Sequence, residues 1–214
     1  MKFLLRSLIT LNLFAAGAVA VLAVDPGTGK SFQGPVGLQL YSLRAQFAAN
    51  GAAKTLDAVK GYGIRYAELA GTYNLKPEQL LKLLSDRGIK AVSGHFPYKR
   101  FKENPEAVAA EAKALGLEFA GCAWADHKAP LDEKQAREIA AVFNRAGAVL
   151  AQHGLRFFYH NHGFEFYPLG NETLMDLIIR ETDPKLVSFQ MDVLWTVFPG
   201  QDPAKLLNKY PGRW

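Results

Sequence analysis

The feature that most constrains the fold is a regular alternation, after residue 34, of short apolar segments with longer helix-patterned segments. The short segments are rich in β-branched and aromatic residues and predict strands at 36–42, 66–70, 91–96, 119–124, 156–162 and 187–195. The longer segments predict helices at about 44–62, 77–87, 105–115, 132–153, 171–182 and 203–210. Strands and helices that alternate with short connections predict a parallel sheet and an α/β fold.

Proline and glycine mark the ends of several of these helices. Proline suits the first helical turn, and it stands there at Pro77, Pro105 and Pro203. Glycine suits the C-terminal cap, and a glycine followed by the apolar start of a strand occurs at Gly88, Gly116 and Gly154. The boundaries of the repeating units are therefore predicted by two independent signals.

Six strand–helix units fit either an open doubly wound sheet or a TIM (β/α)8-type barrel of which about six units are present. A glycine-rich phosphate loop after the first strand would favour the open sheet, but the segment Gln39-Leu40-Tyr41-Ser42 contains no glycine. Each predicted strand instead ends in polar or aromatic residues, which suits a site ringed by strand ends. The sequence favours the barrel, over residues 35–214.

The N-terminal segment is typical of a secretory signal peptide. Lys2 and Arg6 precede an apolar run at 8–24 that closes in small residues, with possible cleavage after Ala20 or Ala23. We expect a signal peptide at 1–23, a linker at 24–34, and an exported, periplasmic or extracellular protein without a stable membrane anchor after cleavage. A retained anchor is the alternative, although the run is marginal in length for a membrane span.

The charge distribution and the cysteine content argue against a nucleic-acid-binding protein and against a fold stabilised by disulfides. The formal net charge is +5, but Lys and Arg are dispersed among acidic residues, and the densest cluster, at 99–102, is too short to follow a nucleic-acid backbone. We therefore expect no nucleic-acid partner. Cys122 is the single cysteine, so no disulfide can form within the chain.

The segment 158–166 carries the strongest chemical signal. His160 and His162 fall on one face of the predicted strand because side chains alternate in a strand, and Glu165 follows just beyond it. Imidazoles and a carboxylate at a barrel rim can bind a divalent metal or the hydroxyls of a polyol. The alternative is a pair of core histidines that hydrogen-bond to neighbouring backbone.

Asp192 lies within the last predicted strand, where a carboxylate is costly to bury unless it is paired, hydrogen-bonded or bound to metal. We interpret it as a metal ligand. The alternatives are a helix N-cap or a salt bridge.

Other strand ends add weaker candidates for substrate contact. Glu68 lies inside the second strand, His95 ends the third and Trp124 ends the fourth. Trp195 ends the sixth strand and joins His160 and His162 in the predicted substrate-binding set. Hydrogen-bonding and stacking groups in such a ring are what a sugar site needs.

Three segments together resemble the xylose isomerase-like TIM-barrel family, often called sugar phosphate isomerase/epimerase. They are Gly37-Leu38-Gln39-Leu40-Tyr41-Ser42-Leu43-Arg44, Tyr159-His160-Asn161-His162-Gly163-Phe164-Glu165-Phe166, and Met191-Asp192-Val193-Leu194-Trp195 followed by Pro199-Gly200-Gln201-Asp202-Pro203. The similarity runs from residue 35 to the C-terminus.

This resemblance implies a divalent cation, Mn²⁺, Mg²⁺, Co²⁺ or Zn²⁺, with Glu165 and Asp192 as its ligands, although some relatives place the first ligand where His160 stands. It implies that Glu165 is also catalytic, and that Glu68 and His95 contact substrate hydroxyls. In relatives a strand with a histidine ligand and a last unit with a glutamate follow Tyr210-Pro211-Gly212-Arg213, so the resemblance implies a shortened chain.

The leading hypothesis is a metal-dependent isomerase or epimerase, or a related lyase, that moves a proton α to the carbonyl of a sugar or keto-sugar. A small-molecule sugar is the expected partner. The alternatives are a non-catalytic sugar-binding remnant of the same fold, and a metal-dependent phosphodiesterase like the endonuclease IV relatives.

Overall fold

The structure, a computed structural model, describes Lys30 and residues 34–214. The predicted signal peptide at 1–23 lies outside the described residues, as does the predicted linker apart from Lys30 and Gly34. Six parallel strands form one sheet in the order β1-β2-β3-β4-β5-β8. They are β1 (Gly37–Gln39), β2 (Tyr66–Leu69), β3 (Lys90–His95), β4 (Phe119–Cys122), β5 (Arg156–His160) and β8 (Val187–Gln190).

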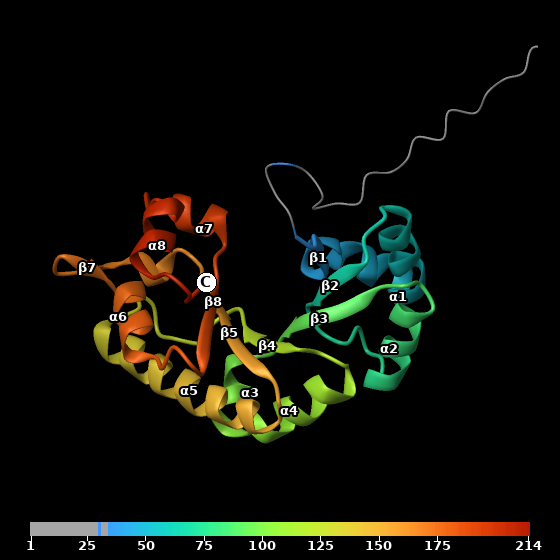
Figure 1. The fold of residues 1–214 in the computed structure, drawn as a ribbon, viewed down its shortest axis with the longest axis horizontal. Helices are drawn as coiled ribbons and strands as arrows, with labels where there is room; N and C mark the ends of the chain where they lie inside the picture. The colour runs from blue at the N-terminus through green and yellow to red at the C-terminus, as the bar shows by residue number, and fades with distance from the viewer. Residues whose placement is uncertain (1–29, 31–33) are drawn as a thin grey trace, which may run out of the picture.

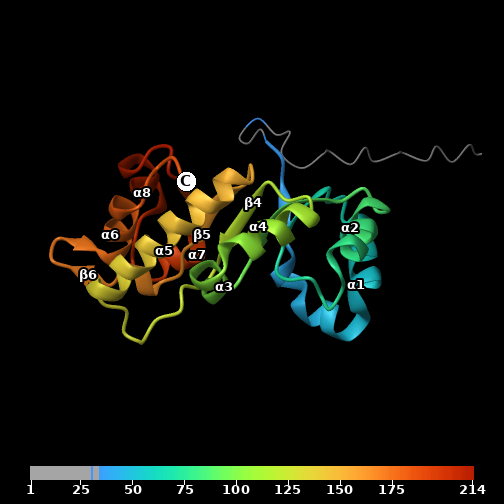
Figure 2. The ribbon, with the colours of Figure 1, turned by 90° about the horizontal axis from the view of Figure 1, so that it is seen from below.

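Helices connect the strands and cover one face of the sheet (Figure 1). They are α1 (Arg44–Gly61), α2 (Pro77–Ser85), α3 (Tyr98–Glu103), α4 (Pro105–Ala114), α5 (Glu133–Gln152), α6 (Leu174–Glu181), α7 (Val193–Val197) and α8 (Pro203–Lys209). Figures 1 and 2 show α1 to α6 along the convex side of a curved sheet, with the concave side left open. The described residues therefore form part of a (β/α) barrel, which confirms the predicted fold class.

The predicted punctuation of the helices is confirmed. Pro77, Pro105 and Pro203 each stand at the start of a helix. Gly88, Gly116 and Gly154 adopt φ of 67°, 70° and 71°. The residue after each glycine donates its N–H to a carbonyl of the last helical turn, as Ile89 does to Leu84 at 3.0 Å. This bond satisfies a helix-end carbonyl and turns the chain into the next strand.

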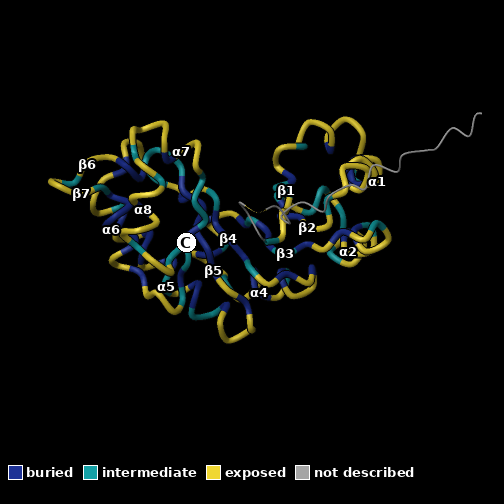
Figure 3. The backbone as a smooth tube through the Cα atoms, turned by 45° about the horizontal axis from the view of Figure 1, so that its top comes forward, coloured by how far each residue is buried: buried dark blue, intermediate teal, exposed yellow. Residues whose placement is uncertain are grey.

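Alternation along each strand separates the core from the concave face. On β5, the rings of Phe157 and Tyr159 pack against Phe143 of α5. Phe158, between them, lines the concave face instead. Figure 3 shows the sheet largely buried and the outer faces of the helices exposed. Alternate side chains of a strand therefore face either the helices or the open, concave side of the sheet.

Close approach of helix and sheet depends on one glycine of α5. A Cβ on Gly147 would lie 2.6 Å from the carbonyl oxygen of Leu186, just before β8. Real Cβ atoms do not approach backbone this closely, so only glycine lets α5 pack at this depth.

The structure corrects several predictions of secondary structure, and the first strand ends at Gln39 instead of Ser42. The last strand ends at Gln190, because the side chain of Asp192 caps a short helix, α7, in place of the continued strand. Helix α3 was not predicted, because its six residues are too few to show a period. The sixth helix begins at Leu174, since a hairpin of β6 (Pro168–Leu169) and β7 (Glu172–Thr173) turns at Gly170.

In the part of the chain that the structure describes, no helix combines the length and apolarity required to cross a bilayer.

Candidate functional site

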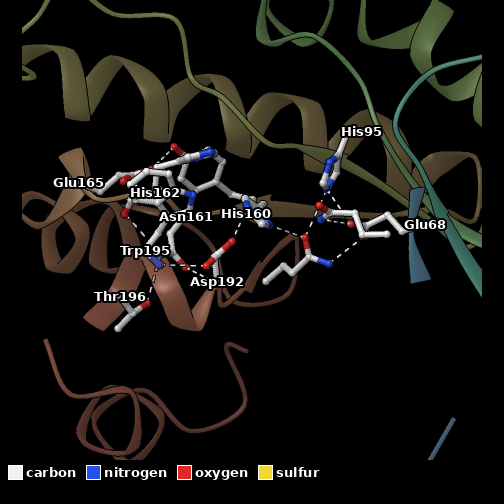
Figure 4. A network of polar contacts seen from close by, with 12 residues as sticks. Glu68, His95, His160, Asn161, His162, Glu165, Asp192, Trp195 and Thr196 are labelled. Carbon is white, nitrogen blue, oxygen red and sulfur yellow. Dashed lines mark hydrogen bonds and ion pairs between the residues drawn. The ribbon is translucent and has the colours of Figure 1, made fainter. Parts of the chain in front are cut away.

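The carboxyl ends of the strands carry a row of polar side chains (Figure 4). At one end of the row, Glu68 on β2 accepts hydrogen bonds from Gln39 on β1 at 2.8 Å and from Ser93 on β3 at 2.7 Å. It also accepts from Gln190 on β8 at 2.8 Å and lies 3.1 Å from Nε2 of His95. Parallel pairing brings these residues together, since Gln39 pairs in register with Glu68, and Glu68 with Ser93.

The charge of Glu68 is set by these partners. Burial alone would raise its pKa, but the hydrogen bonds from His95, Ser93 and Gln39, and the charge of His95, hold the pKa at about 2. Glu68 is therefore an ionised carboxylate at neutral pH. Such a group is a strong hydrogen-bond acceptor and a poor base.

Gln190 links Glu68 to His160. Because the Glu68 carboxylate can only accept, the amide nitrogen of Gln190 must face it, and the amide oxygen must face the opposite way. That oxygen lies 2.8 Å from Nδ1 of His160 and 3.3 Å from Nε2 of His95. Nδ1 of His160 therefore carries a hydrogen and donates it to Gln190. Nε2 of His95 also carries a hydrogen, which lies between Gln190 and the nearer Glu68.

His160 then faces Asp192 in an unusual way. Burial lowers the pKa of His160, which favours the neutral ring, and the proton of that ring is held on Nδ1 by Gln190. The other nitrogen, Nε2, lies 3.3 Å from Oδ2 of Asp192. A lone pair thus faces a carboxylate, and this contact is favourable only if a proton or a metal ion lies between the two atoms.

Asp192 itself is held in place by two hydrogen bonds. Its backbone N–H donates to Oδ1 of Asn161, a fully buried residue, at 3.0 Å. Its own Oδ1 accepts from the backbone N–H of Trp195 at 2.9 Å. The N-cap, which the sequence offered as an alternative to metal ligation, is observed, and Asp192 lies just past the strand instead of within it. Oδ2 is the oxygen left for other chemistry.

Glu165 lies at the other end of the row and is fully buried. It accepts hydrogen bonds from the hydroxyl of Tyr159 and from the backbone N–H of His162, the latter at 3.0 Å. Burial raises its pKa to about 7, although these two donors oppose the rise. Its carboxylate therefore fixes the backbone conformation of the segment that follows β5.

His162 follows the end of β5 and packs among aromatic rings. Its ring centre lies 5.2 Å from that of Trp124 and 5.6 Å from that of Trp195. Burial, and then the nearby His160, lower its pKa to about 4, so the ring is neutral at physiological pH. Its Nδ1 is buried and has no hydrogen-bond partner among the described residues.

The structure thus brings the predicted residues into two neighbouring groups. Glu68, His95, His160 and Asp192 share the polar row, and Trp124, His162 and Trp195 share the aromatic group. Among the described side chains, no contact joins Glu165 to Asp192, so their predicted sharing of a metal ion stays a prediction. Neither Gln190 nor Asn161 was among the predicted site residues. Gln190 could have been found, because it lies two positions before Asp192 and so shares its face of the predicted strand.

The described residues offer a partial set of metal ligands. Nowhere among them do three His, Cys, Asp or Glu side chains gather closely enough to hold a metal ion. His160 and Asp192 together supply one nitrogen and one oxygen, the ligand types that Zn²⁺ and Mn²⁺ accept. This pair fits two of the ligand positions of such an ion.

A cavity opens beside the polar row on the concave side of the sheet. Its volume is about 680 Å³, and its lining includes Glu68, Ser93, Phe158, Gln190 and Trp214. Ligand pockets of this size hold small molecules, and the mixture of apolar walls with few polar groups is typical of them.

Comparison with known proteins gives a consistent result. No family model matches the chain. An inosose dehydratase from Geobacillus thermodenitrificans is 29% identical over 166 residues, which cover 68% of this chain and 55% of that protein. The chain thus spans about half the length of this relative.

Solved structures agree in fold. A sugar phosphate isomerase/epimerase from Parabacteroides distasonis superposes with a TM-score of 0.74 at 25% identity, over 88% of this chain and 77% of that one. The IOLI protein, solved with a zinc atom bound, superposes with a TM-score of 0.64 at 11% identity, over 84% and 70% of the two chains, and shows the fold alone. The curved parallel sheet and the sequence likeness over most of the described residues agree: the chain has the fold of the xylose isomerase-like TIM barrels and is similar in sequence to a sugar phosphate isomerase/epimerase and to an inosose dehydratase, which confirms the resemblance seen in the sequence.

Proposed function

We propose that this protein moves a proton α to the carbonyl of a sugar or keto-sugar, as an isomerase, an epimerase or a dehydrating lyase. The observation that carries the proposal is the contact between Nε2 of His160 and Oδ2 of Asp192, at 3.3 Å. His160 is joined by a hydrogen bond to Gln190, which lines a cavity of about 680 Å³. The names of two similar proteins, a sugar phosphate isomerase/epimerase and an inosose dehydratase, point to substrates of this kind.

A divalent metal ion fits this contact. With its proton on Nδ1, His160 presents a free lone pair toward Asp192, and both atoms would bind a cation directly. His160 and Asp192 would hold the ion, with further ligands from outside the described set. When bound, such an ion polarises a carbonyl oxygen and acidifies the neighbouring C–H.

The remaining side chains of the row bind and orient the substrate. Glu68, ionised at neutral pH, would accept a hydrogen bond from a sugar hydroxyl in exchange for one of its four present donors, and the side chain of His95 next to it would contact the same part of the sugar. Gln190 keeps the protons of His95 and His160 on fixed nitrogens. These groups select a polyhydroxylated ligand and fix its carbonyl relative to His160 and Asp192.

Glu165 is our candidate for the group that moves the proton. A pKa of about 7 suits a carboxylate that accepts and returns a proton at neutral pH. Both donors that now hold it, Tyr159 and the N–H of His162, would have to be released for its carboxylate to reach a substrate.

The reaction is tested by exchange of solvent deuterium. The protein is incubated in D₂O with a panel of keto-sugars and an inosose, with and without Mn²⁺ or Zn²⁺, and loss of the α-proton is followed by NMR. We expect exchange that Glu165→Gln abolishes and that Glu138→Gln, on the exposed face of α5, leaves unchanged. Tight binding without exchange in any combination would instead establish the sugar-binding alternative.

The metal site is tested by two substitutions of one residue. Asp192→Asn keeps an oxygen that can accept from the N–H of Trp195, whereas Asp192→Ala removes both the cap and the charge. We expect both variants to lose at least tenfold in affinity for Mn²⁺ or Zn²⁺ by calorimetry, and Asp192→Asn to keep the wild-type melting temperature. Unchanged metal affinity in Asp192→Asn would contradict the assignment.

We also propose that the protein is exported, on the strength of the signal peptide predicted at 1–23. Expression in a bacterial host and N-terminal sequencing of the periplasmic protein should give a mature chain that begins near Val21 or Val24. A protein that keeps its full mass in the cytosol would contradict the proposal.

A further inference from the structure

A second cavity lies next to the polar row and is built almost wholly of aromatic rings. Its volume is about 300 Å³. Its lining is Trp124, His162, Gly163, Phe164, Tyr167, Trp195, Phe198 and Pro199. These residues come from the segments that follow β4, β5 and β8, so the cavity opens at the same edge of the sheet as the polar row.

The rings form the walls of a slot. Trp124 meets Phe164 edge to face, with ring centres 4.9 Å apart, and Phe164 is stacked parallel to His162 at 6.0 Å. On the other side, Trp195 meets Phe198 edge to face at 5.8 Å. Figure 4 shows His162 and Trp195 adjacent to His160 and Asp192. The slot thus adjoins the proposed sugar site at His162, whose ring lies 5.2 Å from that of His160.

Two of these rings are exposed to an unusual degree. Trp124 is 51% exposed and Phe198 is 77% exposed. Single exposed apolar residues are ordinary, but large rings that gather around one cavity mark a binding surface. A ligand that fills the slot would bury the exposed faces of these rings.

The lining of the slot has few polar groups. None of its eight lining residues is Lys or Arg, so the lining offers no cation for a phosphate group. Nδ1 of His162 is a buried polar atom without a partner among the described residues. This single nitrogen forms one hydrogen bond, enough for one oxygen of a ligand and too few for the several hydroxyls of a second sugar ring.

We propose that this slot binds a planar aromatic substituent attached to the sugar, so that the substrate is an aryl-substituted sugar. The inference rests on the proposed function for the position of the sugar itself, in the polar row beside His160. The aromatic substituent stacks between the rings of Trp124 and Phe198, and one oxygen at the junction with the sugar reaches Nδ1 of His162.

Binding of matched small molecules tests the slot without any turnover. The probes are phenyl β-D-glucopyranoside, methyl β-D-glucopyranoside, cellobiose and glucose 6-phosphate, each titrated calorimetrically. We expect the phenyl glucoside to bind about tenfold more tightly than the methyl glucoside, which corresponds to ~1.4 kcal/mol. Equal affinity of these two, or tighter binding of cellobiose or glucose 6-phosphate, would overturn the assignment.

Substitutions locate the effect. Phe198→Ala and Trp124→Ala alter exposed rings, so both variants should fold, and each should reduce the advantage of the phenyl over the methyl glucoside to less than threefold. The control is Tyr62→Ala, an exposed tyrosine at the end of α1, and it should keep the full advantage. A preserved advantage in both slot variants would place the aryl group elsewhere.

The outcomes separate this inference from the proposed function. A phenyl advantage without deuterium exchange in any keto-sugar would leave the slot in place and remove the proposed reaction. Deuterium exchange without tighter binding of the phenyl glucoside would support the proposed reaction and overturn the aryl-binding slot.

Discussion

The charge of Glu68 gives the sharpest prediction about this protein. The pKa of this carboxyl falls from its ordinary 4.5 to about 2 in the folded state. At ~1.36 kcal/mol for each unit of pKa, the difference corresponds to a stabilisation on the order of 3 kcal/mol at neutral pH. Because the side chain is nearly buried, solvent screening reduces this figure little.

The sign follows from which state binds the proton more tightly. The unfolded chain protonates Glu68 below about 4.5, whereas the folded chain resists protonation until about pH 2. The stabilisation is therefore fully present above pH 4.5 and is lost as the pH falls toward 2. Between pH 7 and pH 3, wild type should lose roughly 2 kcal/mol through this group alone.

Glu68→Gln removes the charge and keeps the size of the side chain. At pH 7 we expect it to lower the free energy of unfolding by ~1–3 kcal/mol, because the donors of Gln39, Ser93 and His95 lose a charged acceptor. Urea denaturation at pH 7, 5, 4 and 3 measures both effects, and the difference between wild type and variant should shrink as the pH falls. Glu138→Gln is the matched control, since its side chain lies on the exposed face of α5. A difference between wild type and Glu68→Gln that stays constant from pH 7 to pH 3 would refute the reasoning.

Three further substitutions test the packing around the site. Gly147→Ala should destabilise the protein by ~1–3 kcal/mol in urea denaturation, because the added carbon meets the backbone of Leu186, whereas Gly61→Ala, where nothing lies within 4 Å, should cost nothing. Tyr159→Phe should lower the free energy of unfolding by ~1–3 kcal/mol at neutral pH, because buried Glu165 loses a hydrogen-bond donor. Its control is Tyr98→Phe, at a buried tyrosine packed edge-on against Phe143, which should lower the free energy of unfolding less. Equal losses in the two variants would contradict the role of the Tyr159 hydroxyl. Asn104→Ala should lower the free energy of unfolding by ~1 kcal/mol, because its side chain caps α4 by accepting from the N–H of Ala107, and an unchanged midpoint in urea would contradict the cap.

Much of the fold could be predicted from local signals. Proline at the start of a helix and glycine just after its end act through φ alone, so Pro105 and Gly116 place the bounds of α4 without any knowledge of the rest of the chain. The order of the units then follows, because strands joined by helices must run parallel. The family resemblance pointed to the same barrel.

The course of the chain after a strand was harder to predict. Residues 187–195 form one apolar run, yet the strand stops at Gln190 because Asp192 caps a helix and its N–H is held by Asn161, which lies thirty-one positions earlier. A pattern of hydrophobicity does not contain that contact. The hairpin at Gly170 escaped prediction for a similar reason, since each of its strands has two residues.

The composition of the site separates the two sources of information most clearly. Residue types and their places at strand ends were enough to select Glu68, His95, His160 and Asp192, because a parallel sheet brings all such ends to one edge. Which atoms meet was settled by the packing of the strands. The register of β5 against β8 pairs His160 with Gln190, whose side chain reaches Glu68 on β2. Proton positions and carboxylate charges depend on those distances over a few ångströms, and such distances arise only when segments far apart in the chain pack together.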